Sequence, residues 1–184
     1  MNDPLAAALL EHAYLEGDVL LRSGKRSRYY LDKYRFETRP EILAPLGERI
    51  ALAVHDFEPG AMRLAGPELG AVALAAAASL ASGRPFLIVR KDAKGYGTAN
   101  RLEGVFEVGE RVCLVEDVVT SAGAAIEAVE ALREAGLEVG TAVCVVDREE
   151  GGEDALAEKG VRLQALFRAS ELLNAPKSAA KPHG

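Results

Sequence analysis

The chain has 184 residues, of which 49% are hydrophobic and 27% charged, and it has no tryptophan. This length suits a single domain with a full hydrophobic core. No apolar run approaches the roughly 18 residues that a membrane span needs, and the first segment, MNDPLAAALLEHAYLEG, lacks the basic start of a signal peptide. The net charge of −6 argues against general nucleic-acid binding. We therefore expect a cytoplasmic protein with no nucleic-acid or membrane partner.

Cysteines and basic residues are unevenly placed along the chain. Cys113 and Cys144 both lie inside apolar runs, which indicates buried small hydrophobic side chains in a reducing compartment. The basic residues crowd into segments 22–35 and 90–94. Basic clusters on an acidic chain suggest a small anionic ligand held at one place, although a solvated face explains such a cluster equally well when charge alone is considered.

The first third of the chain mixes helical and extended patterns. Residues 2–16 have apolar positions at helical spacing, and residues 18–22 and 27–35 read as short strands around the turn SGKR, in the manner of a hairpin. Residues 39–57 are amphipathic, and Pro40 marks the expected start of that helix.

From residue 62 onward, predicted strands and helices alternate. Apolar strands are expected over residues 62–66, 86–91, 111–117, 140–148 and 161–168. Helices are expected over residues 69–83, 125–136 and 151–160, with glycines at the ends of the first two. Apolar strands separated by helices indicate an α/β fold with a parallel sheet covered on both faces. We expect one domain over residues 1–173 and a frayed tail over residues 174–184.

Ligands of such sheets bind beyond the carboxyl ends of the strands, which directs attention to LVEDVVTSAGAA, residues 114–125. Glu116 and Asp117 are expected where the strand ends, so that each carboxylate can accept a hydrogen bond from one hydroxyl of a cis-diol or hold the water shell of a divalent cation. The small residues 120–124 would let an anion approach the first amides of the next helix. The stretch suits a ribose 5-phosphate, and two solvated acids before a capped helix are the alternative.

Other segments suggest where the rest of a ligand would bind. In residues 89–104, three cations at a strand end precede a glycine-bearing loop that could close over a polyanion. In residues 22–30, two tyrosines beside cations could sandwich a planar anionic base. Arg148 follows another strand end and could grip a carboxylate with two hydrogen bonds. Taken singly, each is also an ordinary surface feature.

Together, these segments resemble the orotate phosphoribosyltransferases, a branch of the type I phosphoribosyltransferases, in order and spacing across residues 18–148. LVEDVVTSAGAA is similar to the superfamily motif for 5-phosphoribosyl 1-diphosphate (PRPP), and RKDAKGYG and SGKRSRYY narrow the resemblance to the orotate enzymes. The resemblance implies a central parallel sheet flanked by helices, with a small N-terminal hood formed largely by residues 1–35. It also implies a homodimer in which the loop of residues 90–97 reaches the partner's site.

The resemblance also implies a role for individual residues. Lys94 and Asp117 would be catalytic, Lys94 by stabilising the leaving diphosphate and Asp117 by holding the ribose. PRPP would be bound by Arg22, Glu68, Leu69, Arg90, Lys91, Lys94, Tyr96, Glu116, Asp117, Val118, Val119, Thr120, Ser121, Ala122, Gly123 and Ala124. Orotate would be bound by Tyr30, Leu31, Thr120 and Arg148. Mg²⁺ would be held mainly by PRPP and water, with no direct protein ligand.

Three positions depart from the family pattern. Tyr96 stands where histidine is usual, and a neutral phenol cannot offer a titrating cation to a phosphate. Ala122 and Ala124 stand where glycine and a hydroxylated residue are common, which removes a hydroxyl from the phosphate turn. Since backbone amides can still bind the phosphate, we expect weaker PRPP binding at most.

The reaction that the resemblance implies is Mg²⁺-dependent transfer of ribose 5-phosphate from PRPP to orotate, giving orotidine 5′-monophosphate and diphosphate in pyrimidine biosynthesis. Displacement at a sugar carbon with a good leaving group needs positioning and positive charge rather than a protein nucleophile. The three histidines lie outside every candidate segment, in keeping with this chemistry. Two alternatives stay open: a phosphoribosyltransferase for another base such as a purine, and a PRPP sensor without catalysis.

Overall fold

The computed structural model describes residues 3–20, 26–92 and 101–174. Its helices are α1 (Pro4–Ala13), α2 (Tyr34–Glu37), α3 (Pro40–Phe57), α4 (Gly70–Ser82), α5 (Gly123–Glu134), α6 (Gly152–Glu158) and α7 (Ala169–Asn174). Its strands are β1 (Tyr14–Leu20), β2 (Arg26–Leu31), β3 (Arg63–Pro67), β4 (Phe86–Val89), β5 (Leu102–Glu103), β6 (Arg111–Val119), β7 (Glu138–Asp147) and β8 (Arg162–Arg168). Within these residues, no helix has both the length and the apolar character that a membrane span requires.

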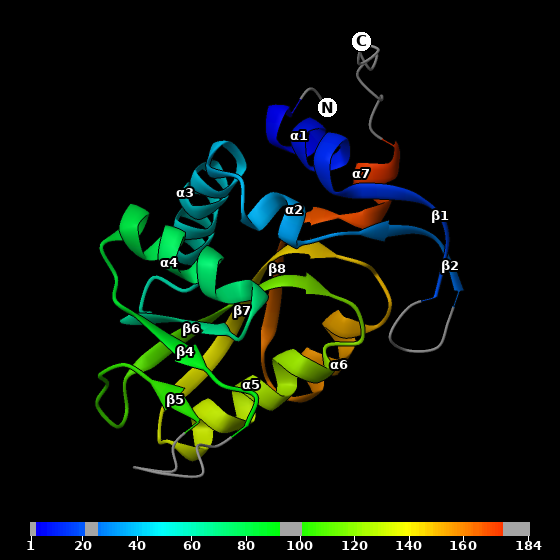
Figure 1. Cartoon of the computed structure of the whole chain (residues 1–184). Coiled ribbons are helices and arrows are strands. Elements are labelled where there is room, and N and C mark those ends of the chain that lie inside the picture. Colours follow the sequence, from blue (N-terminus) through cyan, green and yellow to red (C-terminus); the bar gives the residue numbers. More distant parts are fainter. Residues whose placement is uncertain (1–2, 21–25, 93–100, 175–184) are drawn as a thin grey trace.

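Six strands form one sheet in the order β5-β4-β3-β6-β7-β8 (Figure 1). All neighbouring pairs from β4 to β8 are parallel, and the edge strand β5 runs antiparallel to β4. The apolar runs of the sequence thus form the predicted parallel sheet. β5 was not predicted, because two residues are too few to carry a recognisable alternation.

Helices cover both faces of this sheet, with α3 and α4 on one side and α5 and α6 on the other (Figure 1). Successive residues of a strand point to opposite faces. Accordingly, Cys113 and Val115 of β6 pack in the cluster that includes α1, α3 and α4, while Val112 and Leu114 pack in the cluster that includes α5 and α6. Both cysteines are free and buried, as expected.

Helix ends follow the sequence signals closely. Pro40 is the first residue of α3, where its missing N–H costs no hydrogen bond. Gly83 ends α4 in the left-handed conformation, with a φ of 72°, and Gly136 follows α5 with a φ of 85°. These ends agree with the predicted helices to within two residues.

The predicted hairpin forms in the N-terminal segment, but its boundaries differ from the prediction. Tyr14 pairs with Leu31, so residues 14–16 belong to β1 and not to the first helix. The strand expected over residues 27–35 ends at Leu31, and the chain then turns into the short helix α2, in which Phe36 and Glu37 are buried. Pairing and burial by distant parts of the chain decide both boundaries, and local periodicity does not report them.

Candidate active site

Four turns meet at the carboxyl edge of the sheet, because β4, β3, β6 and β7 are parallel neighbours. The turn after β3 begins at Glu68, β4 is followed by Arg90, β6 by Thr120 and β7 by Arg148. β4 ends at Val89, two residues earlier than predicted. The sheet order therefore brings Glu68, Arg90, Thr120 and Arg148 to one edge, while residues 26–30 belong to the separate hairpin of β1 and β2.

Glu116 and Asp117 lie inside β6, which continues to Val119, and not at the end of the strand as the sequence suggested. The strand is longer than predicted because Val119 still pairs with Asp147 of β7. Both acids are buried, with 7% and 5% of their surface exposed. Burial, and then the negative charge of Asp117, raises the pKa of Glu116 to about 8.

Lys33 and Glu37 join these acids, although the sequence analysis assigned neither a role. Lys33 Nζ donates to Asp117 Oδ2 at 2.6 Å. Burial alone would lower the pKa of Lys33, but the charge of Asp117 and the hydrogen bond to it raise the value. Glu37 is 4% exposed, and burial followed by the charge of Asp117 raises its pKa to about 8. Their i, i+4 spacing, which places both on one helical face, was the available signal.

The turn after β3 packs directly against this ion pair. A Cβ at Gly70 would collide with Asp117 and lie 2.7 Å from Lys33 Nζ, so only glycine fits. Glu68 Oε1 accepts a hydrogen bond from the Lys91 backbone at 2.7 Å, which ties this turn to the end of β4. The peptide between Glu68 and Leu69 is cis, and the Leu69 side chain is 73% exposed.

The turn after β6 leaves the N-terminus of α5 open. Ala122 occupies the N-cap position with a φ of 61°, and no side chain caps the helix there. Gly123 and Ala124, the first residues of α5, are exposed together with Ser121. The outward N–H groups and the helix dipole favour an anion at this place, as the sequence analysis predicted.

Arg148 contacts both the N-terminal hairpin and the turn that follows β7. Its guanidinium lies 4.7 Å from the Tyr29 ring centroid, and its Nη2 pairs with Glu150 at 3.0 Å. Tyr29 in turn stacks on Tyr14, with ring centroids 5.7 Å apart. The guanidinium is thus part of a stack that starts in the N-terminal hairpin.

The two hairpin residues predicted to line the base differ in exposure. Tyr30 is 37% exposed, whereas Leu31 is 7% exposed and belongs to the core cluster under α1. Thr120, predicted to touch both substrates, is partly exposed at the end of β6, after the half-buried Val118 and the buried Val119. The hairpin residue that contacts Arg148 is Tyr29, the neighbour of Tyr30 in β2, and the sequence analysis assigned Tyr29 no individual role.

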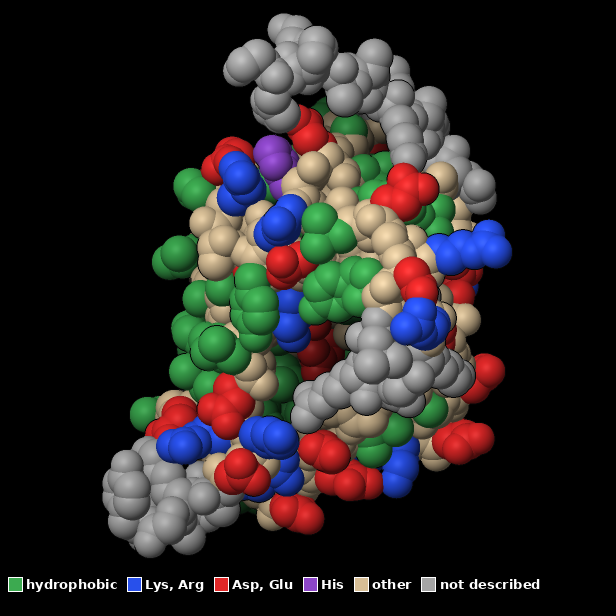
Figure 2. Space-filling view, turned by 45° about the vertical axis from the view of Figure 1, so that its right-hand side comes forward, with side chains coloured by type: hydrophobic (Ala, Val, Ile, Leu, Met, Phe, Trp, Pro, Cys, Tyr) green, Lys and Arg blue, Asp and Glu red, His purple; other side chains and the backbone are tan. Residues whose placement is uncertain are grey.

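Only some of the cations that the sequence analysis placed at the loop of residues 90–97 are among the described residues. Arg90 donates its backbone N–H to Arg101 at 2.7 Å and pairs with Glu103 at 3.4 Å, and Lys91 is exposed. Arg22, Lys94 and Tyr96 lie outside the described residues. Figure 2 shows a hollow on this side of the molecule with acidic side chains at its floor and a basic one beside it.

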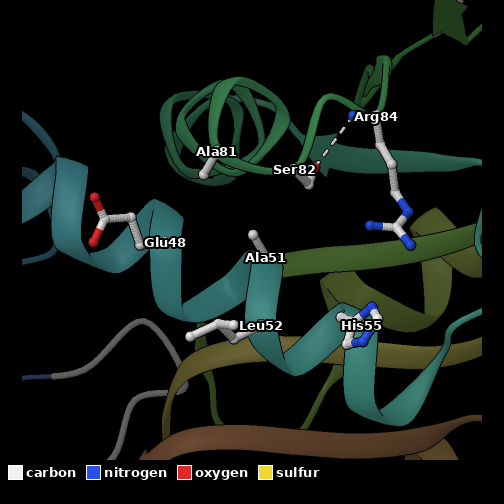
Figure 3. A pocket seen from close by; sticks show the side chains of 7 residues that line it. All are labelled: Glu48, Ala51, Leu52, His55, Ala81, Ser82 and Arg84. Carbon is white, nitrogen blue, oxygen red and sulfur yellow. Dashed lines mark hydrogen bonds between the residues drawn. The ribbon is translucent and has the colours of Figure 1, made fainter.

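A separate pocket of about 390 Å³ lies between α3 and the end of α4 (Figure 3). It is lined by Glu48, Ala51, Leu52, His55, Ala81, Ser82 and Arg84. Arg84 Nε donates to the Ala61 carbonyl at 2.9 Å, so the basic group serves the loop before β3. Because these helix ends precede β3 and β4, the pocket lies toward the amino ends of the strands, away from the four turns.

The described residues contain no group of three His, Cys, Asp or Glu side chains arranged to hold a metal ion directly. Carboxylate oxygens are nevertheless suitable partners for the water shell of Mg²⁺. Glu116 Oε1 is buried in the described structure without a hydrogen-bond partner. This donor set fits an ion that is bound mainly by its substrate and by water.

Comparison with known proteins gives the family. No protein-family model matches the chain. An orotate phosphoribosyltransferase of Methanocella arvoryzae is 54% identical over 157 residues, which are 85% of this chain and 88% of that protein. The chain belongs to the orotate phosphoribosyltransferase family. The crystal structure of the Aeropyrum pernix member of this family matches with a TM-score of 0.81 and 34% identity, covering 92% of this chain and 96% of that one.

Membership of the orotate phosphoribosyltransferase family confirms the predicted α/β fold of the type I kind and the predicted class of enzyme, a pentosyltransferase. The family's reaction, transfer of a phosphoribosyl group to orotate in pyrimidine biosynthesis, is the predicted one. A crystal structure of the Mycobacterium tuberculosis H37Rv orotate phosphoribosyltransferase in complex with PRPP is 30% identical, with a TM-score of 0.77, and covers 92% of this chain and 96% of that one.

Proposed function

We propose that the chain catalyses Mg²⁺-dependent transfer of ribose 5-phosphate from PRPP to orotate, giving orotidine 5′-monophosphate and diphosphate. The observation that carries the proposal is that buried acids, an uncapped helix N-terminus and a stacked arginine come from neighbouring strands of the sheet and the turns that follow them. These are acceptors for a diol, donors for a phosphate and a partner for a carboxylate.

In this mechanism, Glu116 and Asp117 hold the ribose hydroxyls, and residues 120–124 bind the 5-phosphate at the start of α5. Arg148, aided by Tyr30, Leu31 and Thr120, orients orotate toward the sugar carbon. Holding both substrates in line lowers the barrier by converting a bimolecular step into one within a single complex. The carboxylates also favour positive charge at the sugar ring as the diphosphate departs.

The diphosphate end is assigned to Glu68, Leu69, Arg90, Lys91, Lys94, Tyr96 and Arg22. Lys94 supplies the main positive charge to the leaving group. Mg²⁺ would supply further positive charge to the diphosphate. It would be held mainly by PRPP and water, and the unpartnered Glu116 Oε1 could accept a hydrogen bond from that water.

We also propose a cytoplasmic homodimer in which residues 90–97 serve the partner's site. Val105 and Val108, in the segment between β5 and β6, are 81% and 80% exposed, which leaves apolar surface for a second copy. The domain organisation proposed is one domain over residues 1–173 with a hood of residues 1–35. Of the tail predicted over residues 174–184, Asn174 is the last residue of α7, and the rest lies outside the described residues. The free, buried Cys113 and Cys144 support a reducing compartment.

The proposal is tested with purified protein, PRPP and Mg²⁺ by following the loss of orotate absorbance, with uracil and hypoxanthine as parallel controls. Orotate consumption that needs both PRPP and Mg²⁺ is the expected result. Consumption of another base would keep the PRPP site and overturn the orotate assignment. PRPP binding without turnover of any base would identify a sensor instead.

A further inference from the structure

A short segment of the N-terminal region, residues 33–37, reaches the buried acids of β6. Lys33 Nζ donates to Asp117 Oδ2 at 2.6 Å, and the Lys33 side chain is 31% exposed while that of Asp117 is 6% exposed. A buried ion pair of this kind is costly to desolvate, so its presence calls for a reason. Asp117 is the residue assigned above to the ribose of PRPP.

Glu37 approaches the same carboxylate from the end of α2. It is 4% exposed, and its Oε1 is buried with no hydrogen-bond partner among the described residues. Burial and the charge of the neighbouring Asp117 raise the pKa of Glu37 to about 8. Glu37 thus adds a second buried carboxyl group beside the ion pair of Lys33 and Asp117.

Asp117 is therefore held from several directions. Its Oδ2 accepts from the Lys33 ammonium at 2.6 Å, and its Oδ1 accepts from the Val118 backbone at 2.5 Å. The absence of a side chain at Gly70 lets the turn after β3 close over the ion pair. A carboxylate with these donors has one orientation, and its remaining lone pairs have fixed directions.

We propose that Lys33 and Glu37 are positioning residues for PRPP, which hold the Asp117 carboxylate oriented toward the ribose hydroxyls. The proposal rests on the assignment of Asp117 to the ribose. Lys33 supplies the counter-charge for a cluster that otherwise contains three carboxyl groups, those of Glu37, Glu116 and Asp117. Without Lys33, Asp117 would lose its charged donor, and its carboxylate would no longer be fixed in one orientation.

The two substrates should respond differently, because orotate is assigned to residues on β2 and β7 rather than to this cluster. Lys33→Met removes the charge while keeping the length of the side chain. We expect the KM for PRPP to rise by about tenfold or more, the factor for losing one hydrogen bond to a charged group. The KM for orotate should stay within about twofold of the original value.

Conservative variants separate positioning from folding. Lys33→Arg restores the charge and should recover most of the affinity for PRPP. Glu37→Gln keeps the size and polarity of the side chain and should raise the KM for PRPP less than Glu37→Leu does. Thermal unfolding of each variant accompanies the kinetics, and equilibrium binding of PRPP with Mg²⁺ gives the same comparison for a variant too slow to assay.

Several outcomes would overturn the inference. Equal changes in both KM values, or a Lys33→Arg variant as weak as Lys33→Met, would reduce Lys33 to a structural role. Asp117→Asn tests the assignment of Asp117 to the ribose, on which the inference rests. If Asp117→Asn weakens PRPP binding but Lys33→Met does not, the inference alone fails. If Asp117→Asn leaves the KM for PRPP unchanged, the ribose assignment fails and the inference falls with it.

Discussion

Ala122 has a left-handed backbone conformation, which is unfavourable for any residue with a Cβ. Its φ of 61° lies in the left-handed region, which costs an alanine about 1–2 kcal/mol. The conformation turns the chain from β6 into α5 without a capping side chain and leaves the first N–H groups of the helix free for an anion. Glycine would adopt the same backbone without this cost.

Gly123→Ala tests this phosphate turn. No protein atom lies within 4 Å of a Cβ built at Gly123, so alanine fits the fold and suits a helix better than glycine. The new methyl group would enter the space proposed for the 5-phosphate, so we expect an unchanged or slightly higher unfolding temperature and a several-fold higher KM for PRPP. A normal KM would show that the phosphate binds elsewhere.

Lys94→Ala tests the assignment of the leaving-group cation. We expect turnover to fall by about a hundredfold or more, because the developing diphosphate charge loses its main partner. Circular dichroism should show an intact fold. Lys159→Ala is the matched control, since Lys159 pairs with Glu130 on the exposed surface of α6 and α5 and should leave turnover unchanged. Near-normal turnover of Lys94→Ala would remove this residue from the mechanism.

At the scale of elements, the N-terminal hairpin supports groups that belong to the sheet. β2 carries Tyr29, which stacks between Tyr14 of β1 and the Arg148 guanidinium that follows β7. Lys33, just before α2, donates to Asp117 of β6, and Glu37 ends α2 near the same carboxylate. The groups on the sheet that we propose to bind substrate are thus contacted by elements from the N-terminal part of the sequence.

Tyr29→Leu and Tyr29→Phe measure the contribution of the stack. Leucine removes the ring beneath Arg148, and we expect a several-fold higher KM for orotate with little change in the KM for PRPP. Phenylalanine keeps the ring face that attracts the guanidinium, so its KM for orotate should stay near the original value. If both variants behave alike, the aromatic ring does not position Arg148.

The pH dependence of stability tests the raised pKa of Glu37, the last residue of α2. The pKa of Glu37 is raised from 4.5 to about 8 on folding, so its stabilising contribution is present below pH 4.5 and is lost as the pH rises through about 8. We expect the original protein to lose stability relative to Glu37→Gln between pH 5 and 8, an interval set by those two values. Chemical denaturation at a series of pH values measures this difference, and parallel curves would contradict it.

At the scale of the whole molecule, the loop of residues 90–97 starts at the end of β4, next to the edge strand β5. The dimer proposal assigns this loop to the site of the partner subunit. If the loop crosses between subunits, each site combines the Lys94 of one subunit with the Arg148 of the other. A monomer, or a dimer with each loop over its own sheet, would keep both residues of a site in one chain. The two arrangements are distinguishable by mixing inactive subunits.

Mixtures of Lys94→Ala and Arg148→Ala should therefore regain activity. Random reassortment makes half of the dimers mixed, and each mixed dimer has one site with both residues intact, so we expect about a quarter of the original activity. Steady-state rates after co-refolding of equal amounts measure the recovery. Mixtures with no more activity than the separate variants would exclude crossing loops.

The local sequence determined the layered core and most of the candidate site. The strands from β3 to β8, apart from the two-residue β5, are apolar runs bounded by glycine-bearing or polar turns, and such runs have few alternatives to a parallel sheet. The segment around Glu116 and Asp117 could be recognised from the sequence alone, because a binding site for a sugar phosphate needs acids followed by small residues. Neither inference required knowledge of distant contacts.

The tertiary structure decided what depends on partners far along the chain. Residues 14–16 continue a helical pattern but pair with β2, and β6 extends past its acids because β7 lies beside it. The meeting of Lys33 with Asp117 joins residues 84 positions apart, and no local pattern encodes it. The periodicity of the sequence indicates which face of a helix or strand is buried. It does not indicate which distant segment covers that face or which charged side chain that segment brings, because these are decided only when the chain folds.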